Sequence, residues 1–596
     1  MKPKPILRVR YMFRFVPKDR DYTEWNLENT TTGGTDEIPE GLKELRPASL
    51  HLFPGDIIDA DGILKESLYR EKGLIPGVLI VNGRTYGRPV QQCTHFGKHV
   101  EKTYKHYYKC VPYDKSLPCV LIPYECKAIG FIKKKSNLYV LFNIRGWVGK
   151  HPEGILQQTI GRVDIPDYFC DYQLHCYELA IPMRQLRNAV LSKMSSTNID
   201  EVLENQPNME NRTGYHIFSI DPGGTKDIDD AMGITTYKDD TGGEAQIISI
   251  YIANVPQWLN ILSLWQHLTK RAATVYLPTK KLPMLHEILS EKTFSLIENK
   301  KNIAFVADLH IQNGTITRTE YNNVVINVNR NYTYEEPELL NNKDYQGIFS
   351  LVRGLNACQK TNYVDTIRDS HDVVAYLMIA MNHDCAKKLS TTGKGIYRSV
   401  TRQAAERSHR DPELSKFLNI WKYTNAQYSA YGEQTGHQMI AGGLEAYVQL
   451  TSPIRRIVDI VNMTSLQLDY GLLKASSEVL YFLELWMKDI DYINKAARHT
   501  RKVQTNCELL HYCLEKAPLH KGTLVEGHII EKDTEQDNCK GVSDAATKYL
   551  VYIPSLKIVT KVISDSDYLI YEKYWFSVHL FTDQDTLQKK VRLQFN

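Results

Sequence analysis

The pattern of hydrophobic and polar positions divides the chain into β-rich ends and a helix-rich centre. Toward the N-terminus, short runs of β-branched and aromatic residues are separated by Gly and Pro, which is typical of strands joined by turns. These runs lie at residues 7–16, 56–61, 77–81, 85–90, 128–132 and 138–144. Residues 26–40, rich in Thr, Gly, Asn and acidic residues, are predicted to form a mobile loop between the first two runs.

The centre of the chain combines apolar runs typical of strands with amphipathic stretches typical of helices. The apolar runs are residues 215–220 and 247–255. Helical periodicity is found at residues 182–202, 256–273, 345–359, 369–389, 411–421, 452–469 and 476–516. The polar stretch 204–213 is predicted to be a linker into this region.

The C-terminal residues return to short strands, predicted at residues 522–530, 549–553, 558–564 and 576–581. Units of about five short strands suit small closed barrels of the OB or cold-shock kind. We therefore predict a multidomain protein in which such β-barrels flank a mixed α/β, helix-rich domain. The predicted domains are residues 1–110, 111–205, 206–517 and 518–596.

At 596 residues the chain is too long for a single core. Its content of 42% hydrophobic and 24% charged residues is ordinary for a soluble protein, and no apolar run approaches the roughly 18 residues of a membrane span. The net charge of +4 is too small by itself to indicate a polyanionic partner. Eleven cysteines without a Cys-x-x-Cys pair favour reduced thiols. The prediction is an intracellular, most simply cytoplasmic protein, with the nucleus or an organelle as alternatives.

Four aspartates are concentrated just after the apolar run 215–220: Asp221, Asp227, Asp229 and Asp230. Like charges this close raise one another's pKa, and burial adds a desolvation cost, so a folded site of this kind requires a cation. Because the nearby donors are hard oxygens, without His or Cys, the sequence predicts Mg²⁺ or Mn²⁺ rather than zinc. A solvated Asp- and Gly-rich turn is the alternative. An EF-hand loop is excluded, because the required Gly and Glu are missing.

A second segment, Thr451-Ser-Pro-Ile-Arg-Arg456, is predicted to begin a helix. Thr451 or Ser452 can cap that helix, and Pro453 is tolerated in its first turn. The free amides at a helix start favour an anion, and Arg455 and Arg456 could grip a phosphate beside them. A capped surface helix with solvated arginines is the alternative.

Together the two segments resemble the signature of the ribonuclease II family, also called the RNB family, of 3′-to-5′ exoribonucleases. The family pattern, an Asp followed six residues later by Asp-x-Asp-Asp-Ala, is matched at all four aspartates, and Thr451 to Arg455 is similar to the family's Thr-Ser-Pro-Ile-Arg. The resemblance implies that Asp221, Asp227 and Asp230 hold Mg²⁺ and that Asp229 binds or orients the attacking group. It also implies that Arg455 touches the scissile phosphate. The implied activity is metal-assisted hydrolysis of single-stranded RNA to 5′-mononucleotides.

The resemblance also implies how RNA is held. Tyr276 and Tyr334 resemble tyrosines that position the 3′-terminal nucleotides, and Arg456 is a further candidate contact. Basic and aromatic residues on the barrels are expected to stack bases and track phosphates: Lys102, Tyr104, Lys105, Tyr107, Tyr108, Lys109, Lys133, Lys134, Lys135 and Tyr139. Exosome-associated members carry an additional N-terminal nuclease domain, for which the residues before 45 leave no room. A monomer without an obligatory protein partner or membrane contact is therefore expected.

The chain departs from the family pattern in places. The family's usual His-Ile-Ala-Asp is Tyr251-Ile-Ala-Asn254 here, and residues 373–378 lack the two glutamates usual in that helix. Two alternatives to an exoribonuclease follow. One is a catalytically silent RNA-binding regulator on the same fold, and the other is a phosphodiesterase with a broader nucleic-acid substrate.

Overall fold

The computed structural model falls into two compact units, each described by itself. The terminal unit comprises residues 1–180 and 502–596, and the central unit comprises residues 181–501. The structure describes residues 12–34, 38–43, 45–71, 73–89, 105–125, 136–147, 149–206, 208–238, 244–334, 336–358, 364, 366–399, 411, 414–415, 417–418, 426–433, 446–515, 524–533 and 547–596.

The terminal unit begins with an antiparallel sheet in the order β2-β1-β3-β4. Its strands are β1 (Met12–Pro17), β2 (Trp25–Asn29), β3 (Ile57–Asp59) and β4 (Leu64–Glu66). Phe13, Phe15, Leu27 and Ile58 are fully buried, as strand alternation requires. The predicted loop 26–40 is therefore wrong at its start, since β2 continues to Asn29. Helices α1 (Glu40–Lys43) and α2 (Leu68–Glu71) accompany this sheet.

A closed five-stranded barrel follows, in the order β5-β6-β7-β9-β8. Its strands are β5 (Ile75–Leu79), β6 (His106–Pro112), β7 (Val120–Tyr124), β8 (Leu138–Gly146) and β9 (Glu153–Arg162). The predicted domain boundary at residue 110 is wrong because it falls inside β6, and β5 pairs with both β6 and β8. Residues 85–89 form no strand, and the predicted strand 128–132 lies outside the described residues.

Two tyrosines expected on the barrel surface are buried instead. Tyr108 is 6% exposed and Tyr139 fully buried, with its ring stacked on Tyr172 of α3 (Pro166–Cys176) at 4.3 Å between centroids. The prediction that these rings stack RNA bases is wrong, because Tyr108 belongs to the hydrophobic core of the barrel and the Tyr139 ring is covered by α3. Lys105 and Lys109 remain accessible and Tyr107 donates to Glu153. Lys102, Tyr104, Lys133, Lys134 and Lys135 lie outside the described residues.

The C-terminal part of this unit is a five-stranded antiparallel sheet in the order β23-β22-β21-β24-β25. Its strands are β21 (Leu524–Asp533), β22 (Thr547–Ile553), β23 (Ile558–Ser564), β24 (Lys573–Thr582) and β25 (Lys589–Phe595). The first four confirm the predicted strands with small shifts. β25 was missed, although its alternation of Val591, Leu593 and Phe595 with polar residues is a strand signal.

The central unit is built on a seven-stranded sheet in the order β10-β17-β16-β13-β12-β11-β18. Its strands are β10 (Glu210–Arg212), β11 (Phe218–Asp221), β12 (Asp230–Lys238), β13 (Glu244–Ala253), β16 (Lys301–Gln312), β17 (Thr315–Asn327) and β18 (Arg330–Thr333). Both faces are covered: Ile248, Ile250 and Ile252 belong to one hydrophobic core, and Tyr251 and Ala253 belong to the other.

The β16–β17 hairpin was not predicted. Its two-residue turn, Asn313-Gly314, has positive φ at both positions, 51° and 72°, and Gln312 pairs with Thr315. An Asn-Gly pair between apolar runs is a strong hairpin signal, because both residues tolerate that conformation. The predicted linker 204–213 is also partly wrong, because Glu210–Arg212 form β10 parallel to β17.

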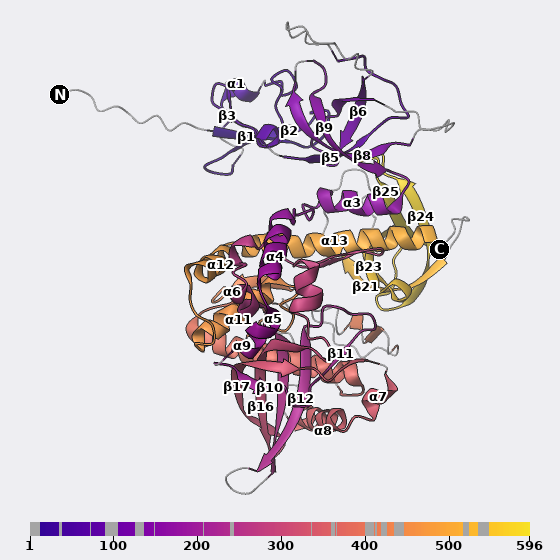
Figure 1. The fold of residues 1–596 in the computed structure, drawn as a ribbon. Helices are drawn as coiled ribbons and strands as arrows, with labels where there is room; N and C mark the ends of the chain where they lie inside the picture. Colours follow the sequence, from indigo (N-terminus) through magenta and orange to yellow (C-terminus); the bar gives the residue numbers. More distant parts are fainter. Residues whose placement is uncertain are drawn as a thin grey trace, which may run out of the picture. The chain divides into compact units, whose positions relative to one another are not determined.

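Helices cover the two faces of the central sheet, and α8 packs on β12 and β17 (Figure 1). The helices of the central unit are α4 (Arg184–Ser196), α5 (Ile199–Glu204), α6 (Val255–Ile261), α7 (Pro337–Leu340), α8 (Lys343–Cys358), α9 (Ser370–Thr392), α11 (Ile457–Asp469), α12 (Ser477–Lys488) and the first part of α13 (Ile490–Glu515), whose residues from 502 on belong to the terminal unit. The predicted helix 256–273 stops at Ile261, and most of 411–421 lies outside the described residues. None of the described helices is both long and apolar enough to cross a bilayer.

Candidate active site

The four aspartates lie where β11 ends and β12 begins. Asp221 is the last residue of β11, Asp230 is the first of β12, and the two strands are antiparallel with Phe218 opposite Met232. Two antiparallel strands joined by a connection place the residues at its two ends side by side. The hairpin therefore brings Asp221 close to Asp229 and Asp230.

The connection itself is held by Ser295, which is fully buried. The Ser295 hydroxyl donates to the carbonyl oxygen of Lys226 at 2.8 Å and accepts from the amide of Ile228 at 2.9 Å. The Leu296 amide donates to the Ile228 carbonyl at 3.1 Å. These bonds satisfy backbone groups of Lys226 and Ile228 and so fix the chain just before Asp229.

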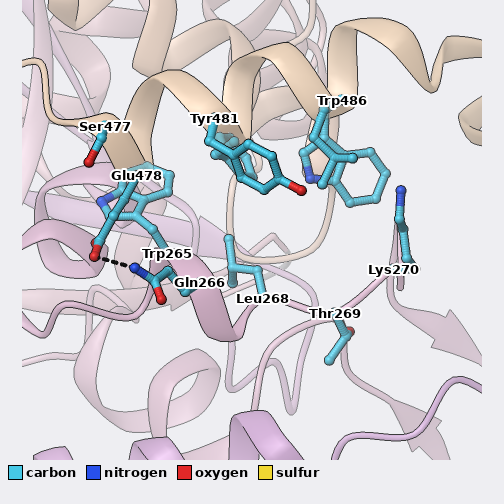
Figure 2. A pocket seen from close by; sticks show the side chains of 11 residues that line it. Trp265, Gln266, Leu268, Thr269, Lys270, Ser477, Glu478, Tyr481 and Trp486 are labelled. Carbon is cyan, nitrogen blue, oxygen red and sulfur yellow. Dashed lines mark hydrogen bonds between the residues drawn. The ribbon is translucent and has the colours of Figure 1, made fainter.

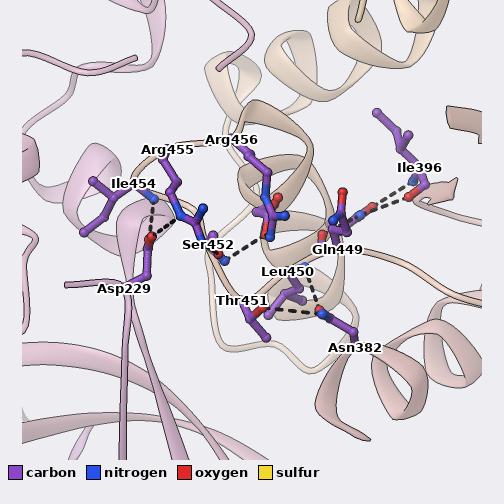
Figure 3. Close-up of polar contacts among 12 residues, drawn as sticks. Asp229, Asn382, Ile396, Gln449, Leu450, Thr451, Ser452, Ile454, Arg455 and Arg456 are labelled. Atoms are coloured by element: carbon purple, nitrogen blue, oxygen red, sulfur yellow. Dashed lines mark hydrogen bonds and ion pairs between the residues drawn. The ribbon is translucent and has the colours of Figure 1, made fainter. Parts of the chain in front are cut away.

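Asp229 and Arg455 form the central contact of the site (Figure 3). One Asp229 oxygen accepts from the Ile454 amide at 2.9 Å, and the other accepts from Arg455 Nε at 3.1 Å. Arg455 Nη2 donates to the Ser452 hydroxyl at 2.9 Å. The Asp229 side chain is 4% exposed and that of Arg455 is 45% exposed. The guanidinium is therefore anchored on one side and accessible on the other.

The segment that carries Arg455 is not the capped helix start that its sequence suggests. Helix α11 begins at Ile457, with Arg456 at the cap position and no side-chain cap bond. Buried amides hold the segment instead (Figure 3): Asn382 accepts from the Leu450 amide at 2.9 Å, and Asn462 donates to the Gln449 carbonyl at 2.8 Å. The prediction was wrong because these partners come from α9 and α11, which local sequence does not reveal.

Arg456 has a partner within the protein. Its Nη2 donates to Asp459 Oδ1 at 2.8 Å, and the same oxygen accepts from the Ser452 amide at 2.8 Å. Asp459 is fully buried and Arg456 is 25% exposed. The Arg456 guanidinium thus helps to hold the arginine segment through Asp459. Its contact with RNA stays a prediction.

Burial dominates the electrostatics of the aspartates. It raises the pKa of Asp221 to about 6, against the hydrogen bond from Ser219 and the charge of Arg455. It also raises the pKa of Asp229 to about 7, although Arg455 and the Ile454 amide favour the carboxylate. Burial, with the charges of Asp221 and Asp229, raises the pKa of Asp230 well above its usual range. These carboxylates therefore share one low-dielectric site with Arg455.

The donor set fits a hard divalent cation, because it consists of carboxylate oxygens alone. One oxygen, Asp221 Oδ2, is buried without a hydrogen-bond partner and would be satisfied by such an ion. Within the described parts of the chain, however, no three His, Cys, Asp or Glu side chains are arranged so that they could hold a metal ion. A bound ion would therefore require some of these side chains to turn.

The two tyrosines occupy different settings. Tyr276, in β14 (Val275–Tyr276), is 44% exposed, and burial of its hydroxyl and the charge of Asp227 raise its pKa. The strand is tied to the arginine segment, since the Thr274 amide donates to the Arg455 carbonyl at 3.0 Å. Tyr334 is stacked on His371, with 3.6 Å between ring centroids. Tyr276 therefore lies at the site, whereas one face of the Tyr334 ring is covered by His371.

Sequence reasoning missed Lys281, which lies in β15 (Lys281–Leu282) opposite Tyr276. Its ammonium is 2.9 Å from Asp227 Oδ1 and 2.9 Å from Glu291 Oε1. Burial alone would lower the pKa of Lys281, but the hydrogen bonds to Glu291 and Asp227 raise it. No local motif marks this lysine. One partner, Asp227, lies 54 residues before it, and the other, Glu291, lies in the separate turn η2 (Leu289–Thr293).

Asn254, where the family usually has Asp, serves the fold. Its side-chain oxygen accepts from the Gln257 amide at the start of α6 and from Gln467, and its nitrogen donates to Asn323. The residue is fully buried. This departure from the family pattern is therefore accommodated by three side-chain hydrogen bonds.

A separate pocket of about 370 Å³ lies between α12 and the short helix η1 (Trp265–His267) (Figure 2). Aromatic rings of Trp265, Phe482 and Trp486 line it, and Gln266 donates to Glu478 at 2.5 Å. None of the predicted site residues lines this pocket.

Comparison with known proteins places these features in a family. A family model described as the RNB domain matches residues 210–348. Exosome complex exonuclease RRP44 of Mus musculus is 26% identical over 306 residues, which is 50% of this chain and 30% of that protein. Ribonuclease R of Chlamydia trachomatis is 24% identical over 314 residues, 41% of this chain and 44% of that protein. The matches thus span less than half the length of either relative.

Solved structures show the same fold. Mycoplasma genitalium RNase R in complex with ribose methylated single-stranded RNA matches with a TM-score of 0.62 at 16% identity, over 98% of this chain and all of that one. Yeast Ssd1, a pseudonuclease, matches with a TM-score of 0.56 at 16% identity, over 84% of this chain and 66% of that one. The predicted architecture of β-barrels around a mixed domain is confirmed. Residues 210–348 are therefore an RNB domain, and the chain is a relative of the RNase R and RRP44 exoribonucleases of the RNB family.

Proposed function

We propose that this protein is a 3′-to-5′ exoribonuclease that hydrolyses single-stranded RNA to 5′-mononucleotides with the help of Mg²⁺. The observation that carries the proposal is the cluster of four aspartates beside Arg455, in which Asp229 bonds Arg455 directly and Asp221 and Asp230 feel its charge. Burial opposes the charge of Asp221, Asp229 and Asp230, and burying such carboxylates costs free energy unless a cation offsets it.

The proposed roles follow from the contacts. Asp221, Asp227 and Asp230 would hold the metal, which when bound activates water and stabilises the leaving oxygen. Asp229 fixes Arg455 Nε and the Ile454 amide, so the accessible side of the guanidinium is aimed at a phosphate in the site. Tyr276 lies near the charge of Asp227 in a strand tied to the arginine segment, and it would stack on or order the terminal nucleotide. Arg455 then neutralises charge that develops on the phosphoryl oxygens.

The proposal is tested with single-stranded RNA and DNA labelled at either end, incubated with the protein in Mg²⁺ or in EDTA. Stepwise loss from the 3′ end of RNA, dependent on metal, with 5′-mononucleotide products, is the expected result. Internal cuts, or equal loss of DNA, would instead support the broader phosphodiesterase.

The second candidate is a silent RNA-binding regulator on the same fold. It is favoured by the likeness to yeast Ssd1, a pseudonuclease, and by the lack of three side chains arranged to hold a metal among the described residues. Binding of the RNA without cleavage in Mg²⁺ or Mn²⁺ is the outcome that would support it.

The affinity for the metal is expected to decrease as the pH decreases. Burial raises the pKa of Asp221 to about 6 and that of Asp230 well above its usual range, so these two proposed metal ligands take up protons as the pH falls in the metal-free protein. A cation must displace those protons, which lowers its apparent affinity by about tenfold per pH unit for each proton released. Titration with Mn²⁺ at about pH 8 and about pH 5.5 measures the change. An affinity that does not depend on pH over this interval would contradict the expected protonation.

Tyr276→Ala is expected to weaken RNA binding by about tenfold to a hundredfold, because stacking contributes about 1–3 kcal/mol per base. The measurement is fluorescence anisotropy with labelled single-stranded RNA in EDTA. Tyr481→Ala removes a ring that is 65% exposed beside the separate pocket, and serves as the control. Equal effects of the two substitutions would remove Tyr276 from the proposed site.

A further inference from the structure

Lys281 connects the candidate metal site to a second carboxylate outside it. The ammonium lies 2.9 Å from Asp227 Oδ1 and 2.9 Å from Glu291 Oε1. The side chains are 24%, 10% and 20% exposed for Lys281, Asp227 and Glu291. Contacts this sheltered are screened less by water and salt than surface ion pairs.

Both ends of this bridge are held in place. Lys281 is in the β14–β15 hairpin, directly opposite Tyr276. Glu291 is in the π-helical turn η2 (Leu289–Thr293), in which Ser290 and Thr293 are buried. Because neither anchor is on a free loop, the ammonium is positioned by the fold.

Two of the four aspartates therefore already have a cation supplied by the chain. Lys281 neutralises Asp227, and Arg455 neutralises Asp229. A divalent ion that uses Asp227 has to compete with the ammonium for the same carboxylate.

We propose that Lys281 is a positioning residue that occupies Asp227 in the metal-free protein and yields it to the divalent cation, with Glu291 retaining the ammonium. The proposal rests on the proposed metal-dependent function and adds how the chain sets its affinity for the metal. Lys281 and Glu291 thereby act in opposite directions: the lysine opposes metal binding, and the glutamate makes its release from Asp227 easier.

The test measures Mn²⁺ binding to the RNA-free protein by calorimetry, with electron paramagnetic resonance of free Mn²⁺ as a second readout. Lys281→Met is expected to lower the Kd for Mn²⁺ by about tenfold, because a positive charge next to a ligand is removed. Glu291→Gln is expected to raise the Kd by about threefold or more, because Asp227 is then the only carboxylate left to the ammonium. Lys281→Arg, which keeps the charge, is expected to stay close to the wild type.

Lys226→Met is the matched control, since it removes the same charge from an exposed lysine of the aspartate connection. It is expected to change the Kd by less than about twofold, because water screens an exposed charge. Thermal unfolding in EDTA verifies that each variant is folded.

The opposite signs separate this inference from a purely structural role, which would weaken metal binding in both Lys281→Met and Glu291→Gln. Such a result, or an unchanged Kd in folded Lys281→Met, overturns the inference and leaves the proposed function standing. A wild-type protein that degrades RNA in EDTA and binds no Mn²⁺ overturns the metal-dependent function, and the inference with it.

Discussion

Asp229→Asn is expected to lower the rate of RNA degradation by about a thousandfold, in line with the loss of one preorganised electrostatic contact. The substitution keeps the shape of the side chain, and its oxygen can still accept from the Ile454 amide. Its amide group, however, would place a donor against Arg455 Nε–H, where the carboxylate now accepts at 3.1 Å. Arg455 is then released from its anchored position, and the site loses one negative charge. The decay of 5′-labelled RNA in Mg²⁺ under single-turnover conditions measures the effect.

The loss should be confined to the chemical step. RNA binding in EDTA is expected to stay within about threefold of the wild type, because Asp229 is buried and contacts protein groups rather than solvent. Asp585→Asn, in which the replaced carboxylate is 64% exposed, is the control and should retain full activity. Degradation by Asp229→Asn at more than a tenth of the wild-type rate, a cutoff of about one order of magnitude, would argue against this role.

Arg212→Met is expected to lower the free energy of unfolding of the central unit by about 3–5 kcal/mol, because it leaves a buried carboxylate without its cation. Arg212 in β10 binds Asp308 of β16 through two hydrogen bonds, 2.9 and 2.7 Å, and both side chains are 9% exposed. Ser249 adds a third bond to Asp308 at 2.6 Å. The pair therefore fastens the edge strand to the middle of the sheet. Urea denaturation followed by circular dichroism measures the loss.

Two variants make this prediction specific. Arg318→Met breaks an ion pair with Glu320 in the same sheet, but these side chains are 61% and 53% exposed, so a change below about 1 kcal/mol is expected. Adding Asp308→Asn to Arg212→Met removes the stranded charge and should recover most of the lost stability. If Arg212→Met alone is as stable as Arg318→Met, the buried pair contributes little.

The sequence contained enough to locate the aspartates and the arginine. The aspartates could be recognised from a short stretch of sequence, because they are neighbours along the chain just after an apolar strand. The β11–β12 hairpin is enough to bring them together. Long periodic helices such as α8 and α9 were predicted for the same reason, since their signal lies within each segment. The β16–β17 hairpin carried an equally local signal in Asn313-Gly314 and could have been predicted.

Other features were decided by partners distant in sequence. The domain boundary near residue 110 could not be predicted from the neighbouring sequence. It depends on the pairing of β5 with both β6 and β8 in the closed barrel. Polarity marked residues 204–213 as a linker, but Arg212 is buried there because Asp308 supplies its counter-charge. Thr451 to Arg456 has the composition of a helix cap, yet Asn382, Asn462 and Asp459 hold it in another shape.

By itself, then, the sequence determined the acidic donors, the arginine that accompanies them and the alternation of strand and helix that frames them. Only the tertiary structure decided which cation each aspartate meets, because Asp227 is paired by Lys281 and Asp229 by Arg455 across 54 and 226 residues of chain. The physical reason is that the charge of a buried carboxylate is governed by whatever lies within a few ångströms of it, and folding, rather than sequence proximity, sets those neighbours.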